Sequence, residues 1–238
     1  MVNRKQKIKT VEVKQNGFTI IEMIVVIAVF LLIIGAAINI FLSIIQNQRR
    51  LLAQQQLLNQ VSYMEEYMSK ALRMAKTEFN EGCLIDAQGT DHRGSIYILT
   101  RYDTNSQIYR GIKFLNQSNL DSLGNPVCQE FFLDNVTPDG ASPLIFNDPN
   151  NPLVLKELKS WNGSSVSDSY AVALTSSNIQ LNSIKFVING LSGSTGASEL
   201  DHIQPRVTIL LNVNASGDSK SSAKTIQTTV SQRNLNVE

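Results

Sequence analysis

The feature that most constrains this chain is an uncharged apolar run from Met23 to Ile45. A helix rises about 1.5 Å per residue, so a run of this length crosses a hydrocarbon core of roughly 30 Å. The seventeen residues before Phe18 carry five basic side chains and one acid, whereas Arg49 and Arg50 follow the run. The excess of positive charge before the run predicts a single span with a cytoplasmic amino terminus and the remainder outside.

The sequence G-F-T-I-I-E, from Gly17 to Glu22, joins the basic leader to the apolar run. This order of parts resembles the signal of type IV prepilins and of the related pseudopilins. In that family a membrane peptidase cuts after the glycine and methylates the new amino terminus. The resemblance implies cleavage of the Gly17–Phe18 bond and N-methylation of Phe18. It also implies a part in assembly and register for Glu22 and its neighbour Thr19.

A conventional secretory signal is the competing interpretation of the same segment. It would take 23–34 as the hydrophobic region and 35–37, G-A-A, as the cleavage site. The apolar run nevertheless continues to Ile45, and an ordinary signal has no need of an acid at its start. We therefore expect the whole run to stay in the mature chain.

Glu22 is the residue whose position asks for an explanation. On insertion scales a charged residue near the centre of a membrane helix costs about 2.5–3.5 kcal/mol, and less towards the interface. The carboxylate is either hydrated at the headgroup level or paired with a cation. In the family that this chain resembles, the acid pairs with the amino terminus of a neighbouring subunit, and cleavage after Gly17 would create that amine.

The helix is expected to continue to about residue 81. The stretch 46–79 contains neither proline nor glycine, and Gly82 follows it as a glycine does just past a helix end. Its apolar residues recur at helical spacing, which predicts one face that packs on a globular head. The members of this stripe are Leu51, Leu58, Val61, Met64, Met68, Leu72, Ala75 and Phe79.

Beyond Gly82 the sequence alternates between strand-like stretches and loops rich in Gly, Ser, Asn and Asp. The expected strands are 95–101, 108–115, 127–133, 179–188, 207–213 and 226–235. They are neighbours in sequence, which favours one antiparallel sheet lying across the helix. The predicted class is α+β and pilin-like. The expected parts are a leader (1–17), a membrane half of the helix (18–45), an exposed amphipathic half (46–81) and a β-rich head (82–238).

Cys83 and Cys128 are the two cysteines, and both belong to the part expected outside the membrane. Disulfides persist in such compartments. The sequence leaves a bridge and a pair of buried thiols open as alternatives.

No pattern typical of an enzyme occurs. His92 and His202 each stand beside an aspartate, and no nucleophile elbow, phosphate loop, zinc spacing or calcium loop is present. The acids Asp134, Asp139 and Asp148 lie near Asn147 and Asn150, a composition that turn formation explains. We expect no catalytic residues, no metal and no cofactor.

Net charge gives no support to nucleic-acid binding. The whole chain carries +1, and loss of the leader leaves sixteen basic against nineteen acidic residues, a net charge of −3. A slightly acidic subunit has no general attraction to DNA.

The sequence thus predicts a prepilin-like structural subunit of a pilus or of a secretion-type pseudopilus. Its large head and long loops favour a minor or initiating subunit. The ending 226–233 also resembles the last strands of minor-pilin-like proteins. The implied partners are other pilin-like subunits, the prepilin peptidase, a membrane assembly platform with its ATPase, and the bilayer. The alternative is a membrane-tethered binding domain that does not polymerise.

Overall fold

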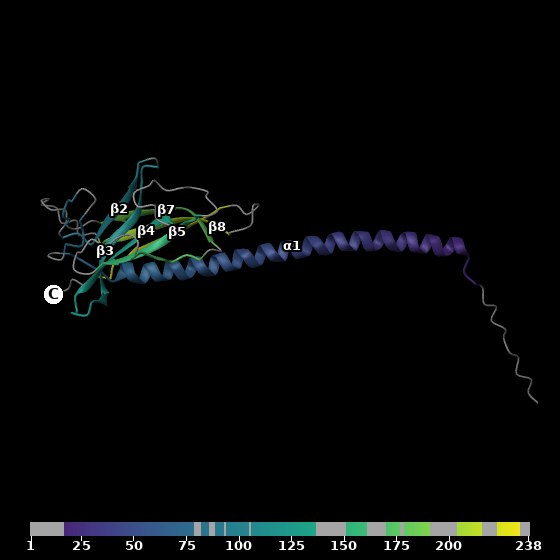
Figure 1. Cartoon of the computed structure of the whole chain (residues 1–238), viewed down its shortest axis with the longest axis horizontal. Coiled ribbons are helices and arrows are strands. Elements are labelled where there is room, and N and C mark those ends of the chain that lie inside the picture. The colour runs from purple at the N-terminus through teal and green to yellow at the C-terminus, as the bar shows by residue number, and fades with distance from the viewer. Residues whose placement is uncertain are drawn as a thin grey trace, which may run out of the picture. The chain divides into compact units, whose positions relative to one another are not determined.

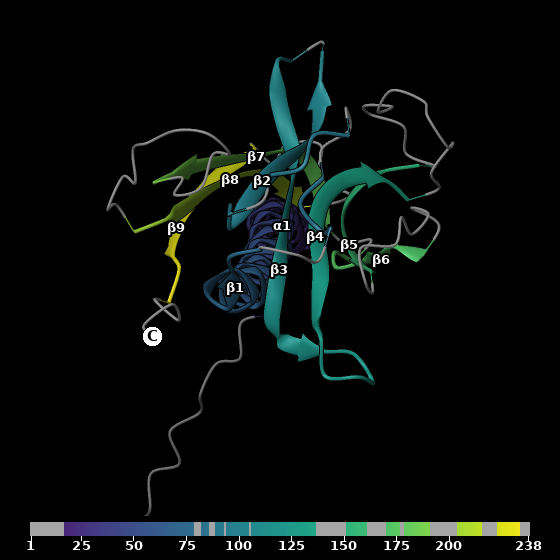
Figure 2. The same ribbon diagram turned by 90° about the vertical axis from the view of Figure 1, so that its left-hand side faces the viewer.

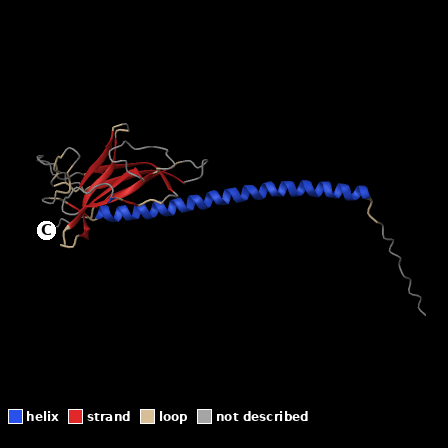
Figure 3. Ribbon diagram, in the orientation of Figure 1, coloured by secondary structure: helices blue, strands red, loops and turns tan. Residues whose placement is uncertain are grey.

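The computed structural model describes residues 17–78, 82–85, 89–92, 94–104, 106–136, 151–160, 170–176, 179–190, 204–215 and 223–233. One long helix, α1 (Ile20–Arg73), is followed by strands (Figures 1 and 3). The strands are β1 (Ala75–Lys76), β2 (Tyr97–Asp103), β3 (Ile108–Leu120), β4 (Pro126–Asn135), β5 (Leu153–Ser160), β6 (Val172–Ala173), β7 (Ile179–Asn189), β8 (Arg206–Ala215) and β9 (Lys224–Ser231). By its contacts the chain divides into two units, Met1–Leu51 and Leu52–Glu238, and α1 belongs to both.

The first part of α1 is the one described helix that is long and apolar enough to cross a membrane, as the sequence predicted. Its apolar side chains are exposed, and in its most apolar stretch no residue is buried in the protein. The polar Asn39 donates its side-chain amide to the Gly35 carbonyl at 2.9 Å. This bond partly satisfies the amide within the helix itself, which lowers its cost in hydrocarbon.

The second part of α1 packs into the core of the head. Its buried side chains follow a 4-3-4-4 spacing through Leu57, Val61, Met64, Met68 and Leu72. This spacing keeps them on one face of a helix with 3.6 residues per turn. The predicted stripe is wrong at its start, because Leu51 and Leu58 are exposed and Leu57 is buried in their place.

The helix ends at Arg73 and not near residue 81, so the predicted boundary is wrong. Other segments take over the backbone acceptors at this end. The Tyr97 hydroxyl donates to the Leu72 carbonyl at 2.6 Å, and the Arg233 amide donates to the Arg73 carbonyl at 3.1 Å. Ala75 and Lys76 then leave the helix to pair with β3. Tertiary hydrogen bonds and not a glycine cap therefore terminate α1.

The strands form two antiparallel sheets, where the sequence predicted one. The six-stranded sheet has the order β1-β3-β4-β5-β6, with β2 also paired to β3, and the second sheet has the order β7-β8-β9. Figure 2 looks along α1 and shows β9 to one side of the helix and β4 and β5 to the other. Side-chain hydrogen bonds join the helix to both sheets. The Glu65 carboxylate accepts from the Thr228 hydroxyl of β9, and the Tyr67 hydroxyl donates to the Glu157 carboxylate of β5. The α+β, pilin-like fold class is confirmed.

The predicted strand positions agree with β2, β3, β4, β7, β8 and β9, and one irregularity explains a break in the pattern. Leu181 and Ile184 are both buried although they are three positions apart in the sequence, an odd spacing that would place them on opposite faces of a regular strand. The pairing of β7 with β8 shifts register between Leu181 and Ser183, so Asn182 is an extra residue. A bulge of this kind returns the following side chains to the core face. It accounts for the imperfect alternation of β7.

The sequence analysis missed β1, β5 and β6, and β5 is the instructive case. Its residues L-V-L-K-E-L-K-S do not alternate, yet seven of the eight are buried. Lys156 is tolerated there because its ammonium lies 2.9 Å from the Asp134 carboxylate, and Glu157 accepts a bond from the Tyr67 hydroxyl at 2.8 Å. Buried charges that have partners look like surface residues when only the sequence is read.

Cys83 and Cys128 are joined by a disulfide with Cα atoms 5.6 Å apart. The bridge ties the segment after β1 to β4, and both sulfurs lie in a small apolar cluster with Leu84, Ile98 and Leu115. The buried Glu78 carboxylate accepts the backbone amides of Cys83 and Leu84. The loop that carries Cys83 is thus held by a carboxylate as well as by the bridge.

We predict that reduction of this bridge destabilises the head by about 4 kcal/mol on chain-entropy grounds, since the cysteines lie 45 residues apart. Alkylation of the denatured, unreduced chain should modify no thiol, and Cys83→Ser with Cys128→Ser should lower the unfolding midpoint. Two alkylated thiols in the unreduced protein would exclude the bridge.

Candidate functional site

The residues of the predicted processing site lie together at the start of α1. Gly17, Phe18 and Thr19 are non-helical, and the helix begins at Ile20. The Phe18 side chain is 79% exposed, and nothing lies within 4 Å of the position that a Cβ of Gly17 would take. The Gly17–Phe18 bond therefore lies in uncrowded, non-helical backbone next to a helix. A peptidase can reach such a bond without unwinding the helix.

Thr19 is the N-cap of α1. Its hydroxyl accepts the Glu22 amide at 3.3 Å, and its carbonyl accepts the Met23 amide at 3.2 Å. The order T-I-I-E matches the capping-box pattern, in which a threonine cap precedes a glutamate by three residues. The sequence analysis assigned Thr19 and Glu22 to assembly and missed this local role, although the pattern was present in the sequence. The motif therefore fixes where the helix begins.

Glu22 lies in the first helical turn, where a carboxylate is favoured by the partial positive charge of the helix amino terminus. Ile20, Ile21 and Met23 around it are all exposed. Within the described part of the chain, the Glu22 carboxylate has no hydrogen-bond or ion-pair partner. It is thus an anion on an apolar surface, available to a cation from another molecule.

The remaining candidate residues that the structure describes show no metal-type cluster. No group of three or more His, Cys, Asp and Glu side chains suited to a metal occurs among the described residues. The Asp134 carboxylate is engaged by Lys156 in the ion pair described above. His202, Asp139, Asp148, Asn147 and Asn150 lie outside the described residues.

Two titratable groups with shifted pKa values, Tyr67 and Lys159, lie where α1 meets the six-stranded sheet. Burial, with the Glu157 carboxylate next in effect, raises the pKa of the Tyr67 phenol. Burial alone would lower the pKa of Lys159, but Glu157, 3.3 Å away, and Tyr67 raise it. Gln129 also donates to Glu157 and accepts from Asn116 at 2.6 Å. With donor and acceptor partners matched, this network joins helix to sheet and resembles no catalytic site.

A family model described as the prokaryotic N-terminal methylation motif matches residues 13–38. No curated protein and no solved structure shows a detectable match to the chain. The matched segment contains Gly17, Phe18, Thr19 and Glu22, and the motif is characteristic of type IV prepilins and pseudopilins. The resemblance seen in the sequence is confirmed. The motif is typical of amino-terminal segments that a prepilin peptidase processes, and together with the apolar start of α1 it supports a membrane anchor at this end of the chain.

We predict that Thr19→Val, which keeps the side-chain shape without the hydroxyl, weakens the first turn of α1 by about 1 kcal/mol. The Glu22 amide should then exchange with solvent about fivefold faster when the full chain is examined by NMR in detergent micelles. Thr19→Ser keeps the acceptor and should exchange like the wild type. Equal rates in the Val and Ser variants would show that Thr19 is not the cap.

Proposed function

We propose that this chain is a subunit of a helical filament, either a type IV pilus or a secretion-type pseudopilus, and that it is a minor or initiating subunit. The observation that carries the proposal is the methylation motif at 13–38 together with the Glu22 carboxylate in the first turn of α1, which has no partner among the residues that the structure describes. The motif supports processing, and the free carboxylate supports packing against a neighbour.

Processing would remove residues 1–17 and leave a methylated Phe18 amine. The new terminus would lie one residue before the Thr19 cap, so cleavage would leave the first helical turn intact. The mature chain would thus present a cation and an anion, four residues apart in sequence, at the same end of α1. That proximity supports an ionic contact between this end and a second subunit.

The Phe18 amine of one subunit would pair with Glu22 of the next. Either charge left alone in an apolar environment costs several kcal/mol, and pairing offsets that cost. The contact would form at one axial offset of the two helices, because both groups are fixed by the capped first turn. Glu22 would therefore set the register of the filament.

We also assign a location to each part of the chain. We assign 18–45 to the bilayer, 46–73 to the exposed part of the helix and the remainder to the head, with the leader in the cytoplasm. The basic leader supports this orientation. The partners would be pilin-like subunits, the prepilin peptidase and a membrane assembly platform driven by a cytoplasmic ATPase. The size of the head, with its two sheets, supports a minor subunit over the bulk one.

Processing is tested by changing the residue before the scissile bond. We predict that Gly17→Leu leaves uncut precursor in the membrane, because a bulky side chain replaces the uncrowded glycine, whereas wild-type protein begins at N-methylated Phe18. Intact-mass measurement of the purified protein distinguishes these forms. A mature chain that begins at Ile38 would indicate ordinary signal peptidase instead.

Assembly is tested at Glu22. We predict that Glu22→Gln or Glu22→Val inserts into the membrane as well as the wild type, because a charge is removed from an apolar segment. Both variants should be cleaved normally but lose incorporation into filaments, as measured by co-purification. Glu66→Gln removes an exposed carboxylate further along α1 and should be incorporated normally. Incorporation of Glu22→Val at the wild-type level would disprove the register role and favour a tethered domain.

A further inference from the structure

Strand β9 is an edge of the three-stranded sheet. It pairs with β8 along its whole length and with no other described strand. Figure 2 shows it beside α1 at the end of that sheet. Half of the amides and carbonyls of an edge strand point away from its partner, and this row is a template for one more strand. Seven of the eight residues of β9 are exposed or partly exposed, and Val230 is the buried one. The edge is therefore accessible to an extended segment of another chain.

This edge lacks the features that usually keep an edge strand from pairing. Those features are charges, prolines, bulges and short length. The run Thr225–Ser231, T-I-Q-T-T-V-S, contains no charge, proline or glycine, and its pairing with β8 has no register shift. By contrast, β1 and β6 have two residues each, and β7 carries the bulge at Asn182. A long, regular and uncharged edge such as β9 pairs readily with another chain.

An apolar side chain of α1 lies next to the position that an added strand would take. The Thr228 hydroxyl of β9 donates to the Glu65 carboxylate at 2.7 Å, so this side of α1 meets the last strand of the sheet. Leu58 lies seven residues before Glu65, two turns earlier on the same side of the helix, and it is 46% exposed. A fourth strand beyond β9 would continue the sheet past Glu65 and cover this leucine.

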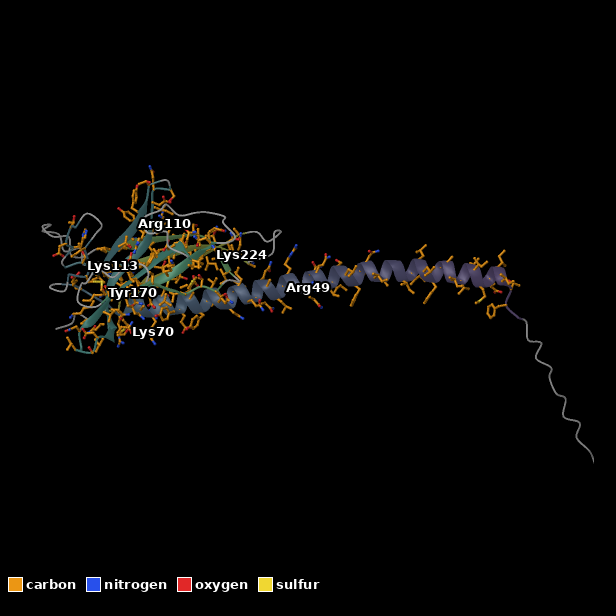
Figure 4. All side chains as sticks on the ribbon, in the orientation of Figure 1. Arg49, Lys70, Arg110, Lys113, Tyr170 and Lys224 are labelled. Atoms are coloured by element: carbon orange, nitrogen blue, oxygen red, sulfur yellow. A yellow bond between two sulfur atoms is a disulfide. The ribbon has the colours of Figure 1, made fainter. Side chains whose placement is uncertain are left out.

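The charge around the edge has one sign. The three strands of this sheet carry Lys185, Arg206 and Lys224 and no acid, and Arg233 follows β9. Figure 4 labels Lys224, at the start of β9. None of the four cations has an ion pair with a residue that the structure describes. Glu65, the acid that meets β9, is bonded to the Thr228 hydroxyl. The sheet is thus a basic surface on a chain that carries −3 without its leader, and it complements an acidic partner.

We propose that the free edge of β9 binds an extended, acidic segment of a neighbouring pilin-like subunit, which adds as a fourth strand to the β7-β8-β9 sheet. The backbone of the segment pairs with Thr225–Ser231, and its inward side chains cover Leu58. Its carboxylates lie near Lys224 at one end of the strand and near Arg233 at the other. The assignment rests on the proposed function, because a filament is what brings a second subunit to this edge.

An acidic segment fits the edge better than the β9 strand of a second copy does. Pairing of two β9 strands would bring together two sheets that carry cations and no acid, and like charges across an interface are unfavourable. Such a contact uses the same patch on both subunits, so it closes a dimer and leaves no β9 edge for further growth.

A nucleic acid fits the edge less well than a strand. The feature that runs the length of β9 is a row of backbone donors and acceptors, which pairs with another backbone. The cations of β9 and its end, Lys224 and Arg233, are separated by the uncharged run Thr225–Ser231. A single-stranded nucleic acid binds along a continuous basic track, and this run interrupts it.

The first test uses the full-length chain in cells that assemble it, with the photo-cross-linker p-benzoylphenylalanine at Thr229. The matched control places it at Val187, which lies in the same cross-strand row, on the other side of Thr208. Both positions are exposed, but Val187 lies two strands, or about 10 Å, from the edge. We expect the Thr229 adduct to map, by mass spectrometry, to an acidic segment of a pilin-like subunit, with a yield at least fivefold above that at Val187.

The charge is tested in the same cells. Lys224→Glu should reduce the yield of the Thr229 adduct at least fivefold, because it places an acid beside the acidic segment, and Lys224→Arg should preserve the yield. Lys70→Glu reverses an exposed charge on α1 and serves as the control, which should leave the Thr229 yield unchanged.

The backbone pairing is tested by hydrogen exchange of the wild-type chain. The amides of β9 that point away from β8 should exchange rapidly in the unassembled chain in detergent micelles. In filaments about half of the amides in 225–231 should exchange at least tenfold more slowly, because the added strand bonds them. The amides of β8, which has strand partners on both sides, should keep their rates.

Several results would overturn the assignment. They are equal yields at Thr229 and Val187, a Thr229 yield that does not depend on Lys224, an adduct to β9 of a second copy, an adduct that carries saccharide or nucleic acid, and unchanged exchange of 225–231 in filaments. Filament co-purification is measured on the same samples. A chain that is incorporated but gives none of the expected adduct defeats the edge assignment alone, and a chain that is never incorporated defeats the proposed function as well.

Discussion

One continuous helix has two parts with different surroundings, an apolar part suited to lipid and an amphipathic part that packs in the head, and the rest of the molecule depends on this division. Up to about Ile45 the helix is apolar on every face, as a lipid-exposed segment must be, with Asn39 bonded back to Gly35. Beyond Leu52 it is amphipathic, and its buried face completes the core that both sheets share. The break between the two structural units falls within the helix, after Leu51. A change in that helix is therefore felt in membrane insertion, in packing of the head, or in both.

The join between helix and sheets combines apolar packing with polar contacts that specify position. Met68 and Leu72 are fully buried, and this apolar burial stabilises the contact between helix and sheets. Because the hydrophobic effect has no direction, it does not by itself fix the exact position of the helix. The Tyr67 hydroxyl, bonded to Glu157, and the Tyr97 hydroxyl, bonded to the Leu72 carbonyl, each need one geometry. A buried hydrogen-bonding group that loses its partner costs free energy. These bonds therefore favour one position of the helix against the sheets over other positions that would bury a similar apolar area.

The parts that sequence could predict are those whose cause is local. The start of α1 and its processing motif depend on six adjacent residues, Gly17 to Glu22, and alternation predicted the strands with one exposed face. The helix end at Arg73 was beyond reach, because its carbonyls are satisfied by Tyr97 and Arg233. Strand β5 was missed because the partners of its buried charges lie on α1 and β4.

The closure of α1 by the final strand has a consequence for biosynthesis. The Gln232 side chain donates to the Ala75 carbonyl at 2.9 Å, across 157 residues of sequence. A chain is translated in order, so these acceptors at the end of the helix must wait until β9 and the two residues after it have been translated. During that interval the helix end is open to water and the core lacks β9. The apolar part of α1 is thus complete long before the core of the head can close, because β9 supplies Val230 to that core.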